Sequence, residues 1–354
     1  MSIPTFTSSV LSPHERGVEF GEHFADQVSA TVAAYRRLFV RRAGGGDFDV
    51  DAWADRAWQA ILDVAPAQED EIAGIAAGAG VPVRDVASIN ARTEILVAAD
   101  PTGQGECSTV VALPPDGAPV AVQTWDWYDA MAPHWLHWTI PHPDGRIVQT
   151  VTEFGMLAKI GVSSTGVGVM LNMLHHENDA KAAAEEKVGY PVHLLSRAIL
   201  DSGQSLADAL AITEAASTTA STSLTVADRA GAAASIELFP GGPGVLEPTD
   251  GLLVRTNHFV SETGRDGCIA AAIGPSSRVR RDHLLAALTG RVPRDADAVL
   301  AAMHHHDPDG GVCRHSDPDQ DPVLRHGTLA TVVLDVDRAT LTARRGGPCG
   351  AGVS

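Results

Sequence analysis

The segment Gly103-Gln104-Gly105-Glu106-Cys107-Ser108-Thr109 leads directly into the apolar run from Val110 to Leu113. The run is typical of a buried strand, and the glycines before it allow the chain to bend sharply. The segment therefore places Cys107 at the first position of a predicted strand, directly after a flexible stretch of chain. That arrangement suits a nucleophile that other groups must reach freely. It also divides the chain, because the residues before it and after it carry different patterns.

The residues before Cys107 are predicted to be helical. Ser12-Pro13-His14-Glu15 is a typical helix start, with Ser as the N-cap, Pro at the first helical position and Glu at the third. Apolar residues at helical spacing then run from Phe20 to Phe39, and Gly17 and Gly21 lie on an adjacent face, where another element is expected to approach closely. Further helices are predicted over residues 51–64, 67–79 and 83–98. We therefore expect residues 1–106 to form an almost entirely helical segment.

The residues from Pro101 onward alternate between strands and helices. The apolar runs and turn sequences indicate two antiparallel sheets packed face to face and covered by helices, an α+β fold with four layers in the order α/β/β/α. Residues 107–354 are expected to form its core, as one structural unit with residues 1–106. The predicted strands are 110–113, 120–125, 135–140, 147–152, 157–162, 168–171, 222–228, 234–239, 252–256, 328–335 and 340–344, and the predicted helices are 191–201, 205–216, 276–288 and 295–304.

Composition limits the classes of partner. The chain has 354 residues, of which 44% are hydrophobic, and its net charge is -18. Such an acidic chain has no basic face for neutralising phosphates, which argues against nucleic acid, and it weakly disfavours anionic membranes. No apolar run is long enough to cross a bilayer, and the first ten residues do not form a signal peptide. The four cysteines form no C-x-x-C pair. We expect a cytoplasmic protein with reduced thiols.

Several motifs, in order along the chain, carry a resemblance to a known family. The chain resembles the acyl-coenzyme A:6-aminopenicillanate acyltransferase family, which are self-processing cysteine hydrolases of the N-terminal-nucleophile (Ntn) type. The matching motifs are Asn90-Ala91-Arg92-Thr93-Glu94-Ile95, Glu106-Cys107-Ser108-Thr109, Gln123-Thr124-Trp125-Asp126-Trp127, Gly166-Val167-Gly168-Val169 with Asn172, Thr256-Asn257-His258, Ser277-Arg278, Cys313-Arg314-His315 and Gly347-Pro348-Cys349.

The resemblance implies both the four-layer fold and a processing event. It implies that the precursor is cut between Glu106 and Cys107, so that Cys107 becomes a new N-terminus. This chain has Glu106 where one common form of the family motif has glycine. We expect the two fragments, residues 1–106 and 107–354, to stay associated after the cut.

An N-terminal cysteine has a chemical reason to act as the nucleophile. A free α-amino group has a pKa of about 7.7–8.0 and a thiol one of about 8.5, so the amine of Cys107 is able to take the proton of its own thiol. Before the cut, the same thiol would attack the Glu106 carbonyl and form a thioester that water resolves. The alternative is a buried structural cysteine, a common fate of free cysteines.

Four polar residues are candidates for supporting Cys107. The family implies that Asp126, on the next strand, orients and polarises the amine–thiol pair; the alternative is a surface carboxylate. Asn257 follows the apolar Leu252-Leu253-Val254 strand, where its side-chain amide would stabilise an oxyanion, and Asn172 has a similar claim. Gln123 is expected to hydrogen-bond nearby. The alternatives are turn-forming or ordinary satisfied polar residues.

The remaining candidates are an arginine and two tryptophans. Arg278 is expected to pair with Asp126 or to hold a substrate carboxylate; the alternative is a surface residue at a helix start. Trp125 and Trp127 flank Asp126 and, with Trp135 and Trp138, would line an acyl pocket or fill the core. We interpret Asn90, Arg92 and Glu94 structurally, as a helix with a surface ion pair.

The histidines raise the question of a metal. Imidazole, thiolate and carboxylate are good zinc ligands, and His304-His305-His306-Asp307 lies near Cys313 and His315. No regular pair spacing such as H-x-x-x-H occurs, so we predict neither a metal site nor a cofactor. The rival hypothesis is a zinc-binding or ligand-binding protein in which Cys107 is only structural. It predicts stoichiometric zinc and an uncut chain.

Within the enzyme hypothesis two reactions are open. Water resolving the Cys107 thioester makes the chain an amidase for a small-molecule amide or acyl substrate, whereas an amine acceptor makes it an acyltransferase. No glycine-rich phosphate loop or cluster of basic residues indicates a coenzyme A site. We therefore predict amide hydrolysis, with acyl transfer as the alternative.

Overall fold

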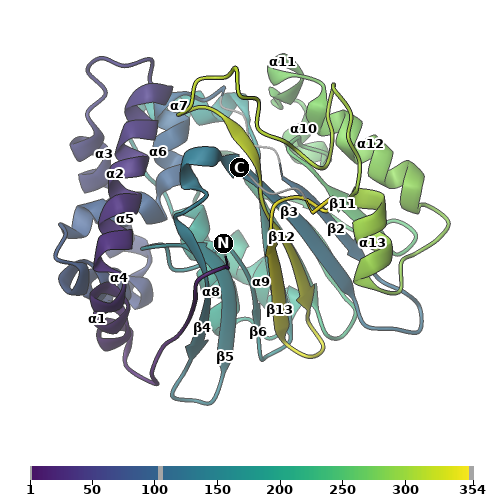
Figure 1. Cartoon of the computed structure of the whole chain (residues 1–354), viewed down its shortest axis with the longest axis horizontal. Coiled ribbons are helices and arrows are strands. Elements are labelled where there is room, and N and C mark those ends of the chain that lie inside the picture. Colours follow the sequence, from purple (N-terminus) through teal and green to yellow (C-terminus); the bar gives the residue numbers. More distant parts are fainter. Residues whose placement is uncertain (1, 103–106, 351–354) are drawn as a thin grey trace.

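The computed structural model describes residues 2–102 and 107–350. Helices α1–α6 lie at one side of the molecule, two β-sheets occupy its middle, and helices α10–α13 lie at the other side (Figure 1). The predicted cut site at Glu106 falls outside the described residues, whereas Cys107 lies within them.

The N-terminal segment is helical, as its sequence predicts. Ser12 caps the first helix: its side chain accepts from the Glu15 backbone N–H, and the Glu15 carboxylate accepts from the Ser12 backbone N–H. In the described part of the chain, no helix is long and apolar enough to cross a membrane. The helices are α1 (Pro13–His23), α2 (Ala25–Arg42), α3 (Val50–Val64), α4 (Pro66–Ala79), α5 (Val83–Asn90) and α6 (Arg92–Ala99).

Helices α1 and α4 touch backbone to backbone, and this contact explains their glycines. A Cβ atom on Gly17 would lie 2.3 Å from the Glu71 carbonyl oxygen, and one on Gly74 would lie 2.2 Å from the His14 carbonyl oxygen. Both distances are far inside van der Waals contact, so only glycine fits. The close approach predicted at Gly17 is therefore confirmed, and its partner is α4.

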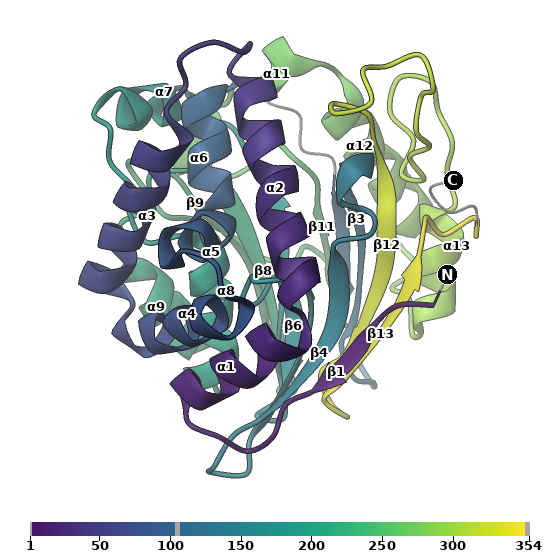
Figure 2. The same ribbon diagram turned by 60° about the vertical axis from the view of Figure 1, so that its left-hand side comes forward.

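The larger sheet has eight strands in the order β1-β4-β5-β6-β7-β8-β9-β10. Its pairs are antiparallel except one, because β1 runs parallel to β4, beside it in Figure 2. The prediction of purely antiparallel sheets is wrong at this edge of the sheet, because the short N-terminal strand β1 pairs with β4 in the parallel direction. The strands are β1 (Thr5–Thr7), β4 (Trp135–Pro141), β5 (Ile147–Glu153), β6 (Ile160–Ser163), β7 (Val167–Met173), β8 (Thr222–Asp228), β9 (Ala233–Leu238) and β10 (Gly244–Leu246).

The smaller sheet has five antiparallel strands in the order β11-β2-β3-β12-β13. The strand that follows Cys107 is therefore internal, between β11 and β3, and is buried along its whole length. The strands are β2 (Ser108–Ala112), β3 (Val120–Tyr128), β11 (Leu252–Arg255), β12 (His326–Asp335) and β13 (Thr340–Arg345).

Three apolar clusters define four layers, which confirms the predicted α/β/β/α order. One packs α1, α4, α8 and α9 on the outer face of the larger sheet, the second fills the space between the sheets, and the third packs α12 and α13 on the outer face of the smaller sheet. These covering helices are α8 (Val192–Ser202), α9 (Leu206–Glu214), α12 (Ser276–Leu288) and α13 (Ala296–Met303).

Several short elements were not predicted, and the edge strand β1 is one of them. The helices α7 (Glu177–Ala184), α10 (Glu262–Arg265) and α11 (Ala270–Ile273) and the strand β10 are too brief to show a clear hydrophobic period.

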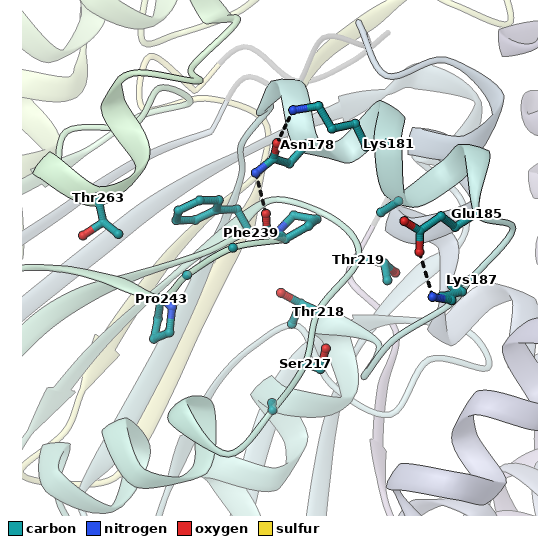
Figure 3. Close-up of a pocket in the computed structure, with 15 residues that line it drawn as sticks. Asn178, Lys181, Glu185, Lys187, Ser217, Thr218, Thr219, Phe239, Pro243 and Thr263 are labelled. Atoms are coloured by element: carbon teal, nitrogen blue, oxygen red, sulfur yellow. Dashed lines mark hydrogen bonds and ion pairs between the residues drawn. The ribbon is translucent and has the colours of Figure 1, made fainter.

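A surface cavity of about 810 Å³ lies between α7 and the loops that follow α9 and β9 (Figure 3). Its lining includes Asn178, Lys181 and Phe239.

Candidate active site

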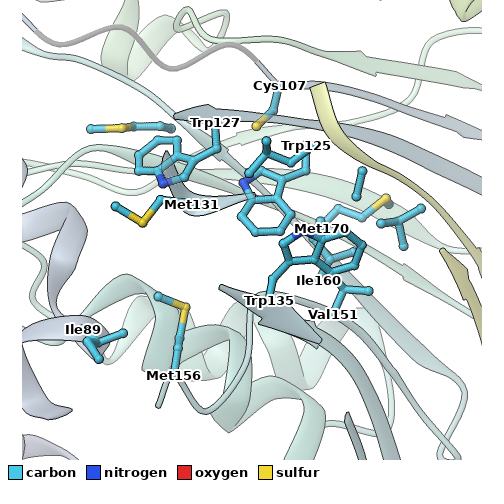
Figure 4. Close-up of a cluster of buried hydrophobic side chains, with 14 of the residues drawn as sticks. Ile89, Cys107, Trp125, Trp127, Met131, Trp135, Val151, Met156, Ile160 and Met170 are labelled. Atoms are coloured by element: carbon cyan, nitrogen blue, oxygen red, sulfur yellow. The ribbon is translucent and has the colours of Figure 1, made fainter. Parts of the chain in front are cut away.

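Cys107 lies at the start of β2, between the two sheets. Its side chain is only 5% exposed and belongs to the apolar cluster that separates the sheets. The β2–β3 hairpin pairs Ser108 with Thr124 and places the Cys107 Sγ 3.8 Å from the backbone oxygen of Asp126. Cys107 projects toward the indoles of Trp125 and Trp127 (Figure 4). The expected closeness of Cys107 and Asp126 is therefore present.

Side chains from three other elements hold the backbone of Cys107. Its N–H donates to the Oδ1 atom of Asn257 at 2.9 Å. Its carbonyl oxygen accepts from the Nδ2 atom of Asn172 at 3.0 Å and from the Nη1 atom of Arg280 at 2.8 Å. All three side chains are buried, so these bonds form away from water and fix the position of the residue firmly.

Arg280 is a site residue that the sequence argument missed. Besides Cys107, its guanidinium donates to Ser108 Oγ at 2.8 Å and to Asn257 Oδ1 at 3.0 Å. Arg278, which was predicted instead, lies on the exposed face of α12. Helical spacing in the sequence indicates that Arg280 is buried. It precedes Leu284 and Leu288 by four and eight residues, so all three face the core.

Asn257 contacts Cys107 through its side-chain oxygen. Its Oδ1 atom faces two donors, the Cys107 N–H and the Arg280 guanidinium, which fixes the orientation of the amide. Its Nδ2 atom donates to the Met173 backbone oxygen at 2.8 Å. The bond to Met173 uses one of the two Nδ2 hydrogens, so the predicted role as an oxyanion donor stays a prediction, beside the observed role as an acceptor for the Cys107 nitrogen.

Asn172 and Gln123 join the two sheets behind Cys107. The Oδ1 atom of Asn172, on β7, accepts from Thr109 Oγ1 on β2 at 2.8 Å. Gln123, on β3, donates to the Leu171 backbone oxygen at 2.7 Å. Asn172 therefore contacts Cys107 directly and Gln123 lies behind it, and both side chains bridge one sheet to the other.

A buried charged network lies below the tryptophans. The Nζ atom of Lys159 is 4.1 Å from the centre of the Trp125 ring and 3.9 Å from a carboxylate oxygen of Glu153. Arg92 donates to Glu153 at 3.1 Å and stacks on Trp127, with its guanidinium carbon 4.1 Å from the ring centre. The interpretation of Arg92 as half of a surface pair is wrong, because its side chain is buried and pairs across to β5.

The tryptophans do not form one wall. Trp125 and Trp135 meet edge to face between the sheets, with ring centres 5.8 Å apart. Trp138 instead packs on the outer face of the larger sheet, where its Nε1 donates to Ser8. Adjacent positions on a strand face opposite sides of the sheet, and residues 135 and 138 differ by an odd number, which separates them. An acyl-pocket role stays a prediction for Trp125 and Trp127.

The charges around Cys107 perturb two pKa values. Burial raises the pKa of the Cys107 thiol to about 11, and the Asp126 carboxylate adds to the rise. Burial lowers the pKa of Lys159 to about 7, and the neighbouring Arg92 cation lowers it further. A protonated Lys159 in turn lowers the pKa of the thiol. In the uncut chain the thiol is thus protonated near neutral pH, beside an ammonium group that is easily deprotonated.

Residues 114–349 match the sequence profile described as acyl-coenzyme A:6-aminopenicillanic acid acyltransferase. The chain belongs to this acyltransferase family. It is also 29% identical to the 40 kDa form of the acyl-coenzyme A:6-aminopenicillanic-acid-acyltransferase of Emericella nidulans, over 80% of this chain and 76% of that protein. The protein is therefore an enzyme of the acyltransferase type.

Solved structures give more distant likenesses. Penicillin V acylase from Agrobacterium tumefaciens aligns with a TM-score of 0.45 at 13% identity, over 68% of this chain and 83% of that one. A mutant of the conjugated bile acid hydrolase from Clostridium perfringens aligns with a TM-score of 0.47 at 11% identity, over 68% of this chain and 92% of that one.

The first prediction separates the two arginines of α12. Replacing Arg280 with Gln should lower activity at least 100-fold, because three buried acceptors around Cys107 lose a charged donor worth roughly 3 kcal/mol in total. Arg278→Gln is the matched control, and its activity should stay within about twofold of wild type. Both are measured as steady-state turnover of a chromogenic amide or ester, with the melting temperature as a check of folding. Equal losses in the two variants would contradict the assignment of Arg280.

The second prediction concerns Lys159 and is made in a Cys107→Ala background, so that any processing at Cys107 cannot complicate the unfolding transition. The pKa of Lys159 is about 7 when folded, against about 10.4 in an unfolded chain. Between these values the unfolded state binds the extra proton, so the free energy of unfolding should rise with pH. From pH 7 to pH 9, that rise should be about 2 kcal/mol larger with Lys159 than in the Lys159→Met variant.

The measurement is urea unfolding of both proteins at the two pH values. The same pH dependence with and without Lys159 would contradict a lowered pKa. Lys187→Met, which changes an exposed lysine, is the control and should leave the pH dependence unaltered.

Proposed function

We propose that the chain is a self-processing N-terminal-cysteine amidohydrolase that works through a thioester on Cys107. The observation that carries the proposal is the hold on the Cys107 backbone by Asn257 on one side and by Asn172 and Arg280 on the other. These backbone groups are satisfied by side chains of distant segments in place of a neighbouring strand, which suits a residue whose nitrogen becomes a free amine after the cut. Membership of the acyltransferase family supports the same chemistry.

The proposed cut is an acyl shift from nitrogen to sulfur. The Cys107 Sγ attacks the carbonyl carbon of Glu106, the peptide bond between the two residues breaks, and the thiol proton passes to the departing amine. Water then attacks the thioester, which releases Glu106 as a carboxylate and regenerates the thiol. The thiol pKa of about 11 means that the proton must leave as the sulfur attacks. Glu106 lies outside the described residues, so its approach to Cys107 is part of the proposal.

After the cut, the same contacts would position the new amine. The Cys107 nitrogen already donates to Asn257 Oδ1, and an α-amine in that place keeps an N–H for this bond. Its lone pair is then free to accept the thiol proton, as its pKa of about 7.7–8.0 allows. Asp126 is buried, and its backbone oxygen lies 3.8 Å from the Cys107 sulfur. We assign it the role of orienting the amine–thiol pair.

The two fragments should stay together, because buried contacts cross the cut. The Asn90 side chain donates to the Gly155 backbone oxygen at 2.8 Å and accepts from the Leu157 N–H at 3.0 Å. Arg92 pairs with Glu153 inside the same core. Separation would expose these polar groups together with the apolar face of the helical segment, at a large cost in free energy.

The proposed substrate is a small-molecule amide, whose acyl group passes to Cys107 and then to water. The net charge of -18 is in keeping with a partner that is neither nucleic acid nor an anionic membrane, and we propose a cytoplasmic location. Acyl transfer is the second candidate, because the Emericella relative is named as an acyltransferase. Adding an amino acid to the assay as an acceptor distinguishes them: a transferase gives the new amide, whereas a hydrolase gives mainly the free acid.

The third prediction tests processing itself. Intact-mass measurement of recombinant protein should show two species, residues 1–106 and 107–354, that elute together in gel filtration. Cys107→Ala should give a single uncut chain, and Cys268→Ser, which removes a different free cysteine, should be cut normally. An uncut wild-type chain that turns over amides without sensitivity to thiol reagents would refute the proposal.

A further inference from the structure

Three metal-binding side chains meet far from Cys107 in the sequence. The ligand atoms of His306, His315 and Cys349 all lie within 4.8 Å of one another. His306 and His315 lie on the loop between α13 and β12, and Cys349 follows β13, so two separate segments converge at this point. We propose that they form a zinc site, with two imidazole nitrogens, one thiolate and a water as the four ligands.

The spacing of the ligand atoms fits a tetrahedral zinc ion. With Zn–N bonds of about 2.05 Å and a Zn–S bond of about 2.3 Å, tetrahedral geometry puts two nitrogens about 3.3 Å apart and a nitrogen and sulfur about 3.6 Å apart. The Nε2 atoms of His306 and His315 are 3.0 Å apart. Cys349 Sγ lies 3.6 Å from the Nε2 atom of His315. Both edges are therefore near the size that zinc requires.

The rings are arranged for a shared ligand. The imidazoles of His306 and His315 are nearly parallel, at 14°, with centres 5.1 Å apart, and their Nε2 atoms face each other. Without an ion, only one proton fits between two such nitrogens. Both rings are exposed, so water has access to the fourth position. A mixed set of two imidazoles and one thiolate favours zinc over magnesium or calcium, which prefer oxygen.

The backbone around the site is already tied in place. The Cys313 N–H donates to the His305 oxygen at 3.0 Å, which closes the loop that carries both histidines. Gly347 lies against Cys313, since a Cβ atom there would be 3.3 Å from the Cys313 Sγ. This contact brings the end of the chain to the loop. Local sequence spacing gives no sign of this metal site, because Cys349 reaches His315 from 34 residues further along the chain.

The site would stabilise β12, the strand that pairs with the Asp126 strand β3. Arg314, beside His315, exchanges two hydrogen bonds of 3.0 Å with Thr328: the Arg314 N–H donates to Thr328 Oγ1, and the Thr328 N–H donates to the Arg314 oxygen. Thr328 pairs with Asp126 across β12 and β3. A metal that fixes the 306–315 loop would thus stabilise the first residues of β12, which pair with β3 at Asp126. This zinc site does not depend on the proposed reaction of Cys107.

The fourth prediction tests the site on the full chain, reduced, freed of metal with a chelator and then titrated with Co²⁺ or Zn²⁺. We expect one equivalent of Co²⁺ to bind with a thiolate-to-cobalt absorption band, Zn²⁺ to displace it, and Zn²⁺ to raise the melting temperature. Cys349→Ser should abolish the band, and His315→Ala should weaken zinc binding at least tenfold.

Matched controls distinguish this site from unspecific uptake. His304→Ala removes a neighbouring exposed histidine, and Cys268→Ser removes a distant thiol; both should bind one equivalent as wild type does. Cys107→Ala should also keep full uptake, which separates this site from the nucleophile. Absence of uptake, or uptake that is the same in Cys349→Ser and in wild type, would overturn the proposal.

Discussion

The structure around Cys107 depends on one constraint, the fixing of its backbone on both sides by buried polar side chains. Asn257 accepts from its nitrogen, and Asn172 and Arg280 donate to its carbonyl oxygen. These partners come from a loop after β11, from β7 and from α12, so both sheets and one covering layer must be in place before the cysteine is positioned. The fold and the site therefore depend on each other, because the elements that form the layers also supply the side chains that hold Cys107.

The space between the sheets is unusually polar for a core. Glu153, Arg92 and Lys159 lie there beneath the tryptophans, each with an opposite charge or an aromatic face nearby. Burying such charges costs free energy that their pairing returns only in part. Their retention next to Cys107 is consistent with an electrostatic role, because the pKa values of the thiol and of Lys159 both depend on this network.

The sequence predicts the layers better than it predicts the site. The helix from Ser276 to Leu288 and the hairpin that joins Cys107 to Asp126 follow from local patterns, and the structure has both. Arg280 was missed because a motif match pointed to Arg278, although helical spacing distinguishes the exposed residue from the buried one. Lys159, Glu153 and Cys349 meet their partners only through tertiary contacts, which no local period encodes. The amide of Asn257 shows the same limit, since its direction is decided by Arg280, on a helix further along the chain.

The most direct test of the account is to trap the acyl-enzyme. The processed protein is mixed with p-nitrophenyl acetate, quenched in acid within milliseconds to seconds, and analysed by intact mass and peptide mapping. The account predicts one acetyl group on the 107–354 fragment, located on Cys107, which forms in a burst and decays at the rate of turnover. Turnover without any adduct, or an adduct on Cys268, Cys313 or Cys349 in place of Cys107, would contradict it.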